Sequence, residues 1–234
     1  MKLLQGLMNS PHALRLLEVL DRRTENRMTE FGMLAQAFEF AKINGVRGDY
    51  FEFGVWRGKT FIHARTMARR YRVSPIVFRA FDSFAGLPPV DKHTKHEVWK
   101  EGQFACSRTE FARILASKGF APGEYDLIEG FYDQSLNDAL VGRLSSAGVR
   151  ASIVYVDCDL YESTVPVLRF IRHFLQDGTI ICFDDYYNYR GQPGHGEQKA
   201  LAEFLQNTPD IRLTPYMTYS PLGQSFICSL QSKG

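Results

Sequence analysis

Asp49-Tyr-Phe-Glu-Phe-Gly-Val-Trp-Arg-Gly58 begins as an apolar strand and ends in a turn that contains two glycines. Gly54 permits a tight turn, and Gly58 would let a ligand approach the N-terminus of a helix that runs to about residue 70. Trp56 stands where the dinucleotide-binding pattern GxGxxG has its middle glycine, so NAD is not favoured. The stretch therefore predicts a strand, a turn and a helix, which serve either as a ligand-binding turn or as a purely structural connection.

Working outward from this stretch, strands and helices alternate along most of the chain. Further strands are predicted at residues 76–81, 125–129, 153–156 and 179–183, and further helices at 109–118, 136–144, 161–176 and 197–206. Residues 211–230 predict a hairpin of two strands. Because alternating strands and helices form right-handed βαβ units, the expected fold is α/β with three layers. Its doubly wound, mostly parallel sheet has seven strands, one of them antiparallel near the C-terminus.

Two helices are predicted ahead of this core, between residues 11 and 44, from apolar side chains at near-helical spacing. Residues 1–44 are therefore expected to be a helical extension, and residues 45–234 the main domain. The extension is amphipathic, and an exposed apolar face of this size usually packs against another part of the protein or against a partner. It is expected to be a lid over the ligand site or the contact of a homodimer.

Composition argues against several classes of protein. The formal net charge of the 234 residues is +2, so there is no strong positive electrostatic potential that would favour nucleic acid as a partner. The four cysteines show no metal-ligand spacing, and they fit a reducing compartment. No apolar stretch is long enough for a membrane span, and the N-terminus lacks the features of a signal peptide. A cytoplasmic protein with no membrane contact is expected.

Carboxylates stand at the ends of four predicted strands. They are Glu52, Asp82, Asp157 followed by Asp159, and Asp184 followed by Asp185. Because the C-terminal ends of parallel strands lie along one edge of the sheet, these acids should converge on one crevice.

Asp82 is the acid expected on the cofactor side of this crevice. An acid after the second strand commonly accepts hydrogen bonds from ribose hydroxyls, although it could also cap a helix or stabilise a turn. Together with the glycine turn, Asp82 indicates an adenosine-type ligand.

The other acids, Asp157-Cys-Asp159 and Asp184-Asp185, have the composition of a divalent-cation site. Mg²⁺ prefers oxygen ligands, and clustered carboxylates need a cation or raised pKa values. A cation here would lower the pKa of a bound hydroxyl and make it a nucleophile. The alternative is helix capping by Asp159 and Asp185 without a metal.

Four motifs in this order resemble those of the macrocin O-methyltransferase family, over residues 48–206. They are Glu52-Phe-Gly-Val-Trp-Arg-Gly58, Phe81-Asp82-Ser-Phe-Ala-Gly-Leu-Pro88, Val156-Asp-Cys-Asp-Leu-Tyr-Glu-Ser-Thr164 and Phe183-Asp-Asp-Tyr186. The family consists of class I methyltransferases that use S-adenosylmethionine.

The resemblance implies that S-adenosylmethionine lies over the C-terminal edge of the sheet. By this resemblance, the residues that bind the cofactor are Glu52, Gly54, Gly58, Asp82, Ser83, Phe84, Gly130 and Phe131. It assigns Mg²⁺ to Asp157, Asp184 and Asp185, with Asp157 also accepting the proton of the acceptor hydroxyl. The implied acceptor is a sugar or another hydroxylated small molecule of natural-product metabolism, and the segment 89–107 is the region expected to select it.

Two other functions are compatible with the sequence. Asp157-Cys-Asp159 is similar to the Asp-x-Asp motif that holds a metal and a nucleotide sugar in glycosyltransferases, although the glycine turn would then have no role. The chain could also be a non-catalytic cofactor-binding module that acts through contact with a partner.

Overall fold

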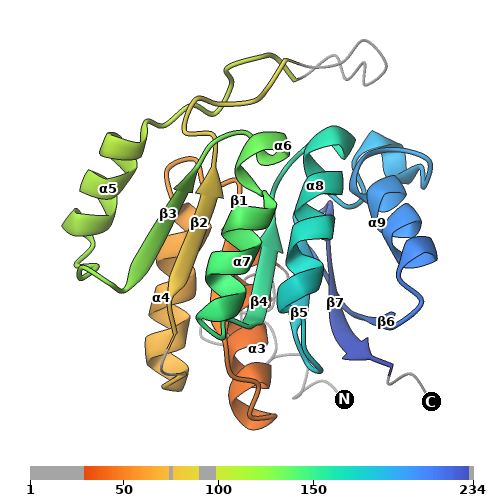
Figure 1. The fold of residues 1–234 in the computed structure, drawn as a ribbon, viewed down its shortest axis with the longest axis horizontal. Helices are drawn as coiled ribbons and strands as arrows, with labels where there is room; N and C mark the ends of the chain where they lie inside the picture. Colours follow the sequence, from red (N-terminus) through yellow and green to blue (C-terminus); the bar gives the residue numbers. More distant parts are fainter. Residues whose placement is uncertain (1–28, 74–75, 90–98, 232–234) are drawn as a thin grey trace, which may run out of the picture.

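The computed structural model describes residues 29–73, 76–89 and 99–231, which form one seven-stranded sheet between two layers of helices (Figure 1). The strand order is β3-β2-β1-β4-β5-β7-β6. The strands are β1 (Asp49–Phe53), β2 (Phe78–Asp82), β3 (Tyr125–Glu129), β4 (Ala151–Val156), β5 (Ile180–Phe183), β6 (Ile211–Tyr219) and β7 (Gly223–Leu230). Only β7 runs antiparallel to its neighbours β5 and β6, so the predicted fold and its antiparallel strand are confirmed.

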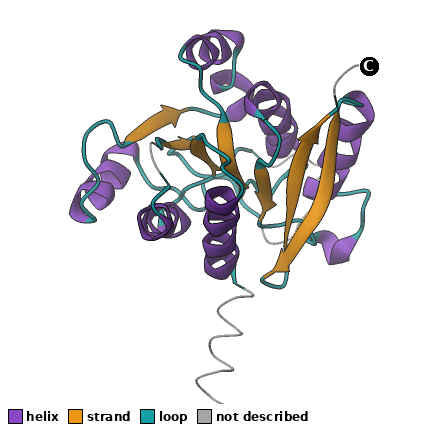
Figure 2. Cartoon of the chain, turned by 90° about the horizontal axis from the view of Figure 1, so that it is seen from below, coloured by secondary structure: helices purple, strands orange, loops and turns teal. Residues whose placement is uncertain are grey.

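The helices cover both faces of the sheet (Figure 2). One layer contains α3 (Glu30–Ile43), α4 (Lys59–Tyr71) and α5 (Arg108–Ser117). The other contains α6 (Tyr132–Ser135), α7 (Asp138–Ser146), α8 (Tyr161–Ile171) and α9 (Gly196–Asn207). Side chains of a strand alternate between faces, so Phe51 and Phe53 of β1 pack against α8, while Tyr50 packs against α3 and α4.

Several boundaries differ from those predicted. The helix predicted to end at residue 176 ends at Ile171 and continues as a 3₁₀ turn, Arg172–Phe174. Helix α6 was not predicted, because four residues are too few to show a helical period. The first of the two N-terminal helices lies outside the described residues, so the lid or dimer contact stays a prediction. No helix in the described part of the chain is long and apolar enough to cross a membrane.

The order of the strands creates a crevice between β1 and β4. Strand β1 pairs with β2 on one side and with β4 on the other. The strands that follow β2 in the sheet therefore extend to one side of β1, and those that follow β4 extend to the other. Main-chain hydrogen bonds continue past the strand ends, from the Asp157 amide to the Phe53 carbonyl at 2.8 Å and from the Gly54 amide to the Phe81 carbonyl at 3.0 Å. Ligands of open α/β sheets bind at such a switch point.

Candidate functional site

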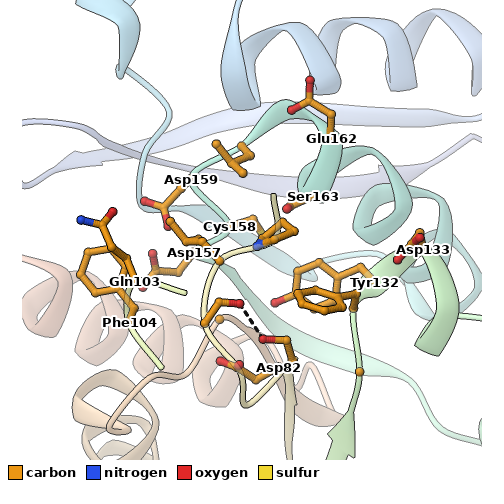
Figure 3. A pocket seen from close by; sticks show the side chains of 18 of the residues that line it. Asp82, Gln103, Phe104, Tyr132, Asp133, Asp157, Cys158, Asp159, Glu162 and Ser163 are labelled. Atoms are coloured by element: carbon orange, nitrogen blue, oxygen red, sulfur yellow. Dashed lines mark hydrogen bonds between the residues drawn. The ribbon is translucent and has the colours of Figure 1, made fainter. Parts of the chain in front are cut away.

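A cavity of about 600 Å³ opens at this edge of the sheet (Figure 3). Its wall includes six of the residues predicted to bind cofactor or metal: Gly54, Asp82, Ser83, Gly130, Phe131 and Asp157. These residues lie at or directly after the ends of β1, β2, β3 and β4, so the expected convergence of four strand ends is present. In Figure 3, Asp157 and Asp159 lie between Asp82 on one side and Glu162 on the other.

Asp82 uses its carboxylate to hold the glycine turn. Its Oδ2 accepts hydrogen bonds from the amides of Val55 at 2.8 Å and Trp56 at 3.3 Å. Its Oδ1 accepts one from the Phe84 amide at 2.7 Å. Burial raises the pKa of Asp82, and these three amides oppose the shift. Asp82 therefore shapes the turn as well as facing the cavity.

Gly54 is required by its backbone and by its neighbours. Its φ is +84°, and a Cβ at this position would lie 1.9 Å from the carbonyl oxygen of Asp157. Only glycine tolerates such a close approach of two main chains. The turn after β1 and the acid after β4 are thus in direct contact.

Three predicted cofactor residues are not part of the cavity wall: Glu52, Gly58 and Phe84. Gly58 begins α4, and a Cβ there would meet the ring of Phe111 at 2.9 Å. The side chain of Phe84 also packs on Phe111, with ring centroids 5.6 Å apart. Gly58 and Phe84 therefore contact Phe111 and support the cavity wall without forming part of it.

Glu52 is fully buried on the side of α4. Its carboxylate accepts hydrogen bonds from the hydroxyl of Tyr50 and, at 2.6 Å, from that of Thr60. Burial raises the pKa of Glu52 to about 8, against the effect of these two hydrogen bonds. Asp184 and Asp82 add to the rise through their charges.

The pKa of Glu52 predicts that the protein loses stability as the pH rises. Because its folded pKa of about 8 exceeds the ordinary 4.5, the contribution is complete below about pH 4.5 and is lost toward pH 8. Linkage gives up to about 1.4 kcal/mol per pH unit within this window. Urea unfolding at pH 6 and pH 8 should show this loss, and Glu52→Gln should reduce it. Glu39→Gln, on the exposed side of α3, is the control and should keep the wild-type slope.

The acids predicted to bind a metal are only partly brought together. One carboxylate oxygen from each of Asp157, Asp159 and Asp185 lies within 4.8 Å of the others. Asp184 does not belong to this group, and its carboxylate accepts a hydrogen bond from the Tyr155 hydroxyl at 2.5 Å. Asp159 does not cap α8, because the N-cap residue is Leu160. Asp159 thus joins Asp157 and Asp185 in this group, and the assignment of a cation to Asp157, Asp184 and Asp185 stays a prediction.

These acids strongly affect one another. Burial raises the pKa of Asp157, and the charges of Asp184 and Asp185 raise it further. Burial also raises the pKa of Asp159 to about 6 and that of Asp185 well above its ordinary value. No basic side chain in the described residues lowers the pKa of Asp159 or Asp185. The three oxygens fit a divalent cation, since cations with oxygen ligands at about 2.0–2.6 Å bring those oxygens within about 5 Å.

Two aromatic side chains of the cavity wall were not predicted. Trp56 and Phe104 are 48% and 44% exposed although both are large and apolar, and their ring centroids are 5.6 Å apart. Phe104 reaches the cavity because the segment between β2 and α5 folds back on itself. The Leu87 amide donates to the Gln103 carbonyl at 2.9 Å, and the Gly102 amide donates to the Leu87 carbonyl at 3.0 Å. Figure 1 shows the described parts of this segment, residues 83–89 and 99–107, over the strand ends.

Proteins with similar sequences include two O-methyltransferases that are named for natural-product substrates. A tetracenomycin-type rhamnosyl 4'-O-methyltransferase from Streptomyces olivaceus is 28% identical over 69% of this chain and 65% of its own. Mycinamicin III 3''-O-methyltransferase from Micromonospora griseorubida is 27% identical over 68% of this chain and 63% of its own. The chain thus spans slightly less than two thirds of the length of these relatives.

The crystal structure of the calicheamicin methyltransferase CalS11 superposes with a TM-score of 0.70 at 23% identity, covering 97% of this chain and 90% of that one. This similarity shows a shared fold. The family model of the macrocin O-methyltransferases matches residues 24–206, which include the glycine turn, Asp82 and the acidic cluster. The chain belongs to the macrocin O-methyltransferase family.

Proposed function

We propose that the protein is an S-adenosylmethionine-dependent, cation-assisted O-methyltransferase that acts on a hydroxyl of a sugar or another small molecule. One observation carries the proposal: a single cavity joins the glycine turn and Asp82 to Asp157 and Asp159 of the acidic cluster at the switch point of the sheet. Its two sides suit an adenosine-type cofactor and an activated hydroxyl respectively.

The residues divide between binding and activation. Gly54, Asp82, Ser83, Gly130 and Phe131 line the side assigned to the cofactor. Their main contribution is to align the methyl group with the acceptor oxygen for in-line attack.

Asp157, Asp159 and Asp185 would hold Mg²⁺ or a similar cation. When bound, the cation lowers the pKa of the acceptor hydroxyl. Asp157 would accept the hydroxyl proton while the acceptor oxygen forms its bond to the methyl carbon, the bond from that carbon to the cofactor sulfur breaks, and S-adenosylhomocysteine leaves.

The exposed aromatic residues indicate the kind of acceptor. Trp56 and Phe104 give the cavity an apolar wall next to a strongly acidic one. Aromatic faces suit the apolar face of a sugar ring or of a polycyclic aglycone. The relative from Streptomyces olivaceus is named for a rhamnosyl substrate, so a deoxysugar glycoside is the first acceptor to try.

Phe104→Ala should weaken acceptor binding and leave the cofactor in place. Loss of one aromatic contact of this kind predicts a rise in the acceptor KM of about 10-fold, equivalent to about 1.4 kcal/mol. Steady-state kinetics with a rhamnosyl acceptor, together with cofactor calorimetry, would measure both effects. Ile43→Ala removes an exposed apolar side chain of α3 outside the cavity wall and serves as the control. An unchanged acceptor KM together with weaker cofactor binding would assign Phe104 to the cofactor instead.

Calorimetry with S-adenosylmethionine, with and without Mg²⁺, tests the proposal directly. The expected result is binding of the cofactor, followed by release of S-adenosylhomocysteine when a hydroxylated acceptor and Mg²⁺ are supplied. A nucleotide sugar should not bind in a parallel titration. Binding of the nucleotide sugar without binding of S-adenosylmethionine would replace the proposal with a glycosyltransferase.

A further inference from the structure

A fourth carboxylate, that of Glu197, lies beside the proposed cation ligands. Glu197 belongs to the first turn of α9 and is only 1% exposed. Its Oε2 accepts a hydrogen bond from the main-chain amide of Asp185 at 3.2 Å. A side chain of α9 thus reaches Asp185, the second residue after β5, and meets the acidic cluster there.

Asp185 is held at two points. Glu197 fixes its main chain, and the Asn188 side-chain amide donates to its Oδ1 at 2.7 Å. Asn188 lies between β5 and α9, and Glu197 lies in the first turn of α9. Asp185 is one of the three residues whose oxygens converge, so its main-chain position determines whether all three can reach one cation.

The second oxygen of Glu197 gives an independent reason to connect this residue with a ligand. Oε1 is buried and has no hydrogen-bond partner within the described structure. A buried acceptor without a partner is costly, and a buried carboxylate more so. This arrangement is what a residue that supports metal ligands requires.

We propose that Glu197 is a positioning residue of the cation site. Its hydrogen bond to the Asp185 main chain keeps the Asp185 carboxylate within reach of the cation that Asp157 and Asp159 also face. This inference rests on the proposed function, because it assumes that the acidic cluster binds a divalent cation. It assigns the role to the reach and acceptor atom of the side chain, and not to its charge.

Two substitutions separate reach from charge. Glu197→Gln keeps the length and a carbonyl acceptor but removes the charge, whereas Glu197→Asp keeps the charge but is one methylene too short. Outer partners of metal ligands typically contribute about 10- to 100-fold to metal affinity. Binding of Mn²⁺ to the whole chain, measured by electron paramagnetic resonance without cofactor, should therefore weaken at least 10-fold in Glu197→Asp. In Glu197→Gln it should stay within about threefold of wild type.

Glu203→Asp is the matched control, since it makes the same change on α9 at a residue that bonds to the Tyr161 hydroxyl. It should bind Mn²⁺ like the wild type, and circular dichroism should show that all three variants are folded. Wild-type affinity in Glu197→Asp, or equal losses in both Glu197 variants, would overturn the positioning role alone. Absence of Mn²⁺ binding to the wild-type protein would overturn the cation site itself, and with it the role of Glu197.

Discussion

Asp157→Asn should lower methyl transfer by about 10³-fold while the protein becomes more stable. The loss is expected because Asn neither accepts the hydroxyl proton nor offers a charged ligand, and general-base catalysis alone contributes about 10²- to 10⁴-fold. Cofactor affinity should change little, because the glycine turn and Asp82 are untouched. Release of S-adenosylhomocysteine measures the first effect, and calorimetry measures the cofactor affinity.

The gain in stability follows from the buried acids. In the metal-free protein, Asp157 is disfavoured by burial and by the charges of Asp184 and Asp185. A neutral residue of the same shape relieves this, by about 1 kcal/mol or more, which corresponds to a melting temperature about 2–4 °C higher. Asp138→Asn, at an exposed position in the first turn of α7, should leave activity unchanged and should not raise stability, since it removes a charge that favours the helix N-terminus. A variant that lost activity and stability together would indicate a structural Asp157.

Gly54→Ala should destabilise the protein by about 3–5 kcal/mol and abolish cofactor binding. The new Cβ would lie 1.9 Å from the Asp157 carbonyl oxygen, so the ends of β1 and β4 would have to separate. The φ of +84° adds backbone strain for any residue other than glycine. Urea unfolding measures the loss of stability, and calorimetry with S-adenosylmethionine measures the loss of binding.

Gly142→Ala makes the same chemical change at a position without these constraints. Gly142 is exposed in α7, and a Cβ added there would meet no heavy atom of the described residues within 4 Å. Alanine at this helical position should stabilise the protein by up to about 1 kcal/mol. Equal effects of the two substitutions would show that the contact between Gly54 and Asp157 is unimportant.

The fold could be predicted because its signals are local. Apolar strands alternate with helices, and the predicted hairpin after residue 211 supplied the antiparallel strand β7. The helix boundaries were less accurate, since α6 has four residues and the turn after Ile171 has no signal of its own. The convergence of acids on one edge also followed from the topology.

The composition of the acidic cluster could not be predicted, because it depends on side-chain direction beyond the strand ends. Asp184 and Asp185 are adjacent in sequence, yet only Asp185 joins Asp157 and Asp159. Glu197 is predicted only as part of a helix, and no sequence signal links it to a residue 12 positions earlier. Phe104 was also missed, since the pairing of Leu87 with Gly102 and Gln103 is a tertiary contact.

That pairing has a consequence for how the enzyme could change its range of acceptors. Within the segment between β2 and α5, main-chain hydrogen bonds join Leu87 to Gly102 and Gln103. We therefore expect changes of length and sequence between Leu87 and Gly102 to leave the acids and the glycine turn in place. Exchanging this loop between relatives should transfer acceptor preference and leave the transfer chemistry intact, which makes it a natural unit for recombination and for engineering.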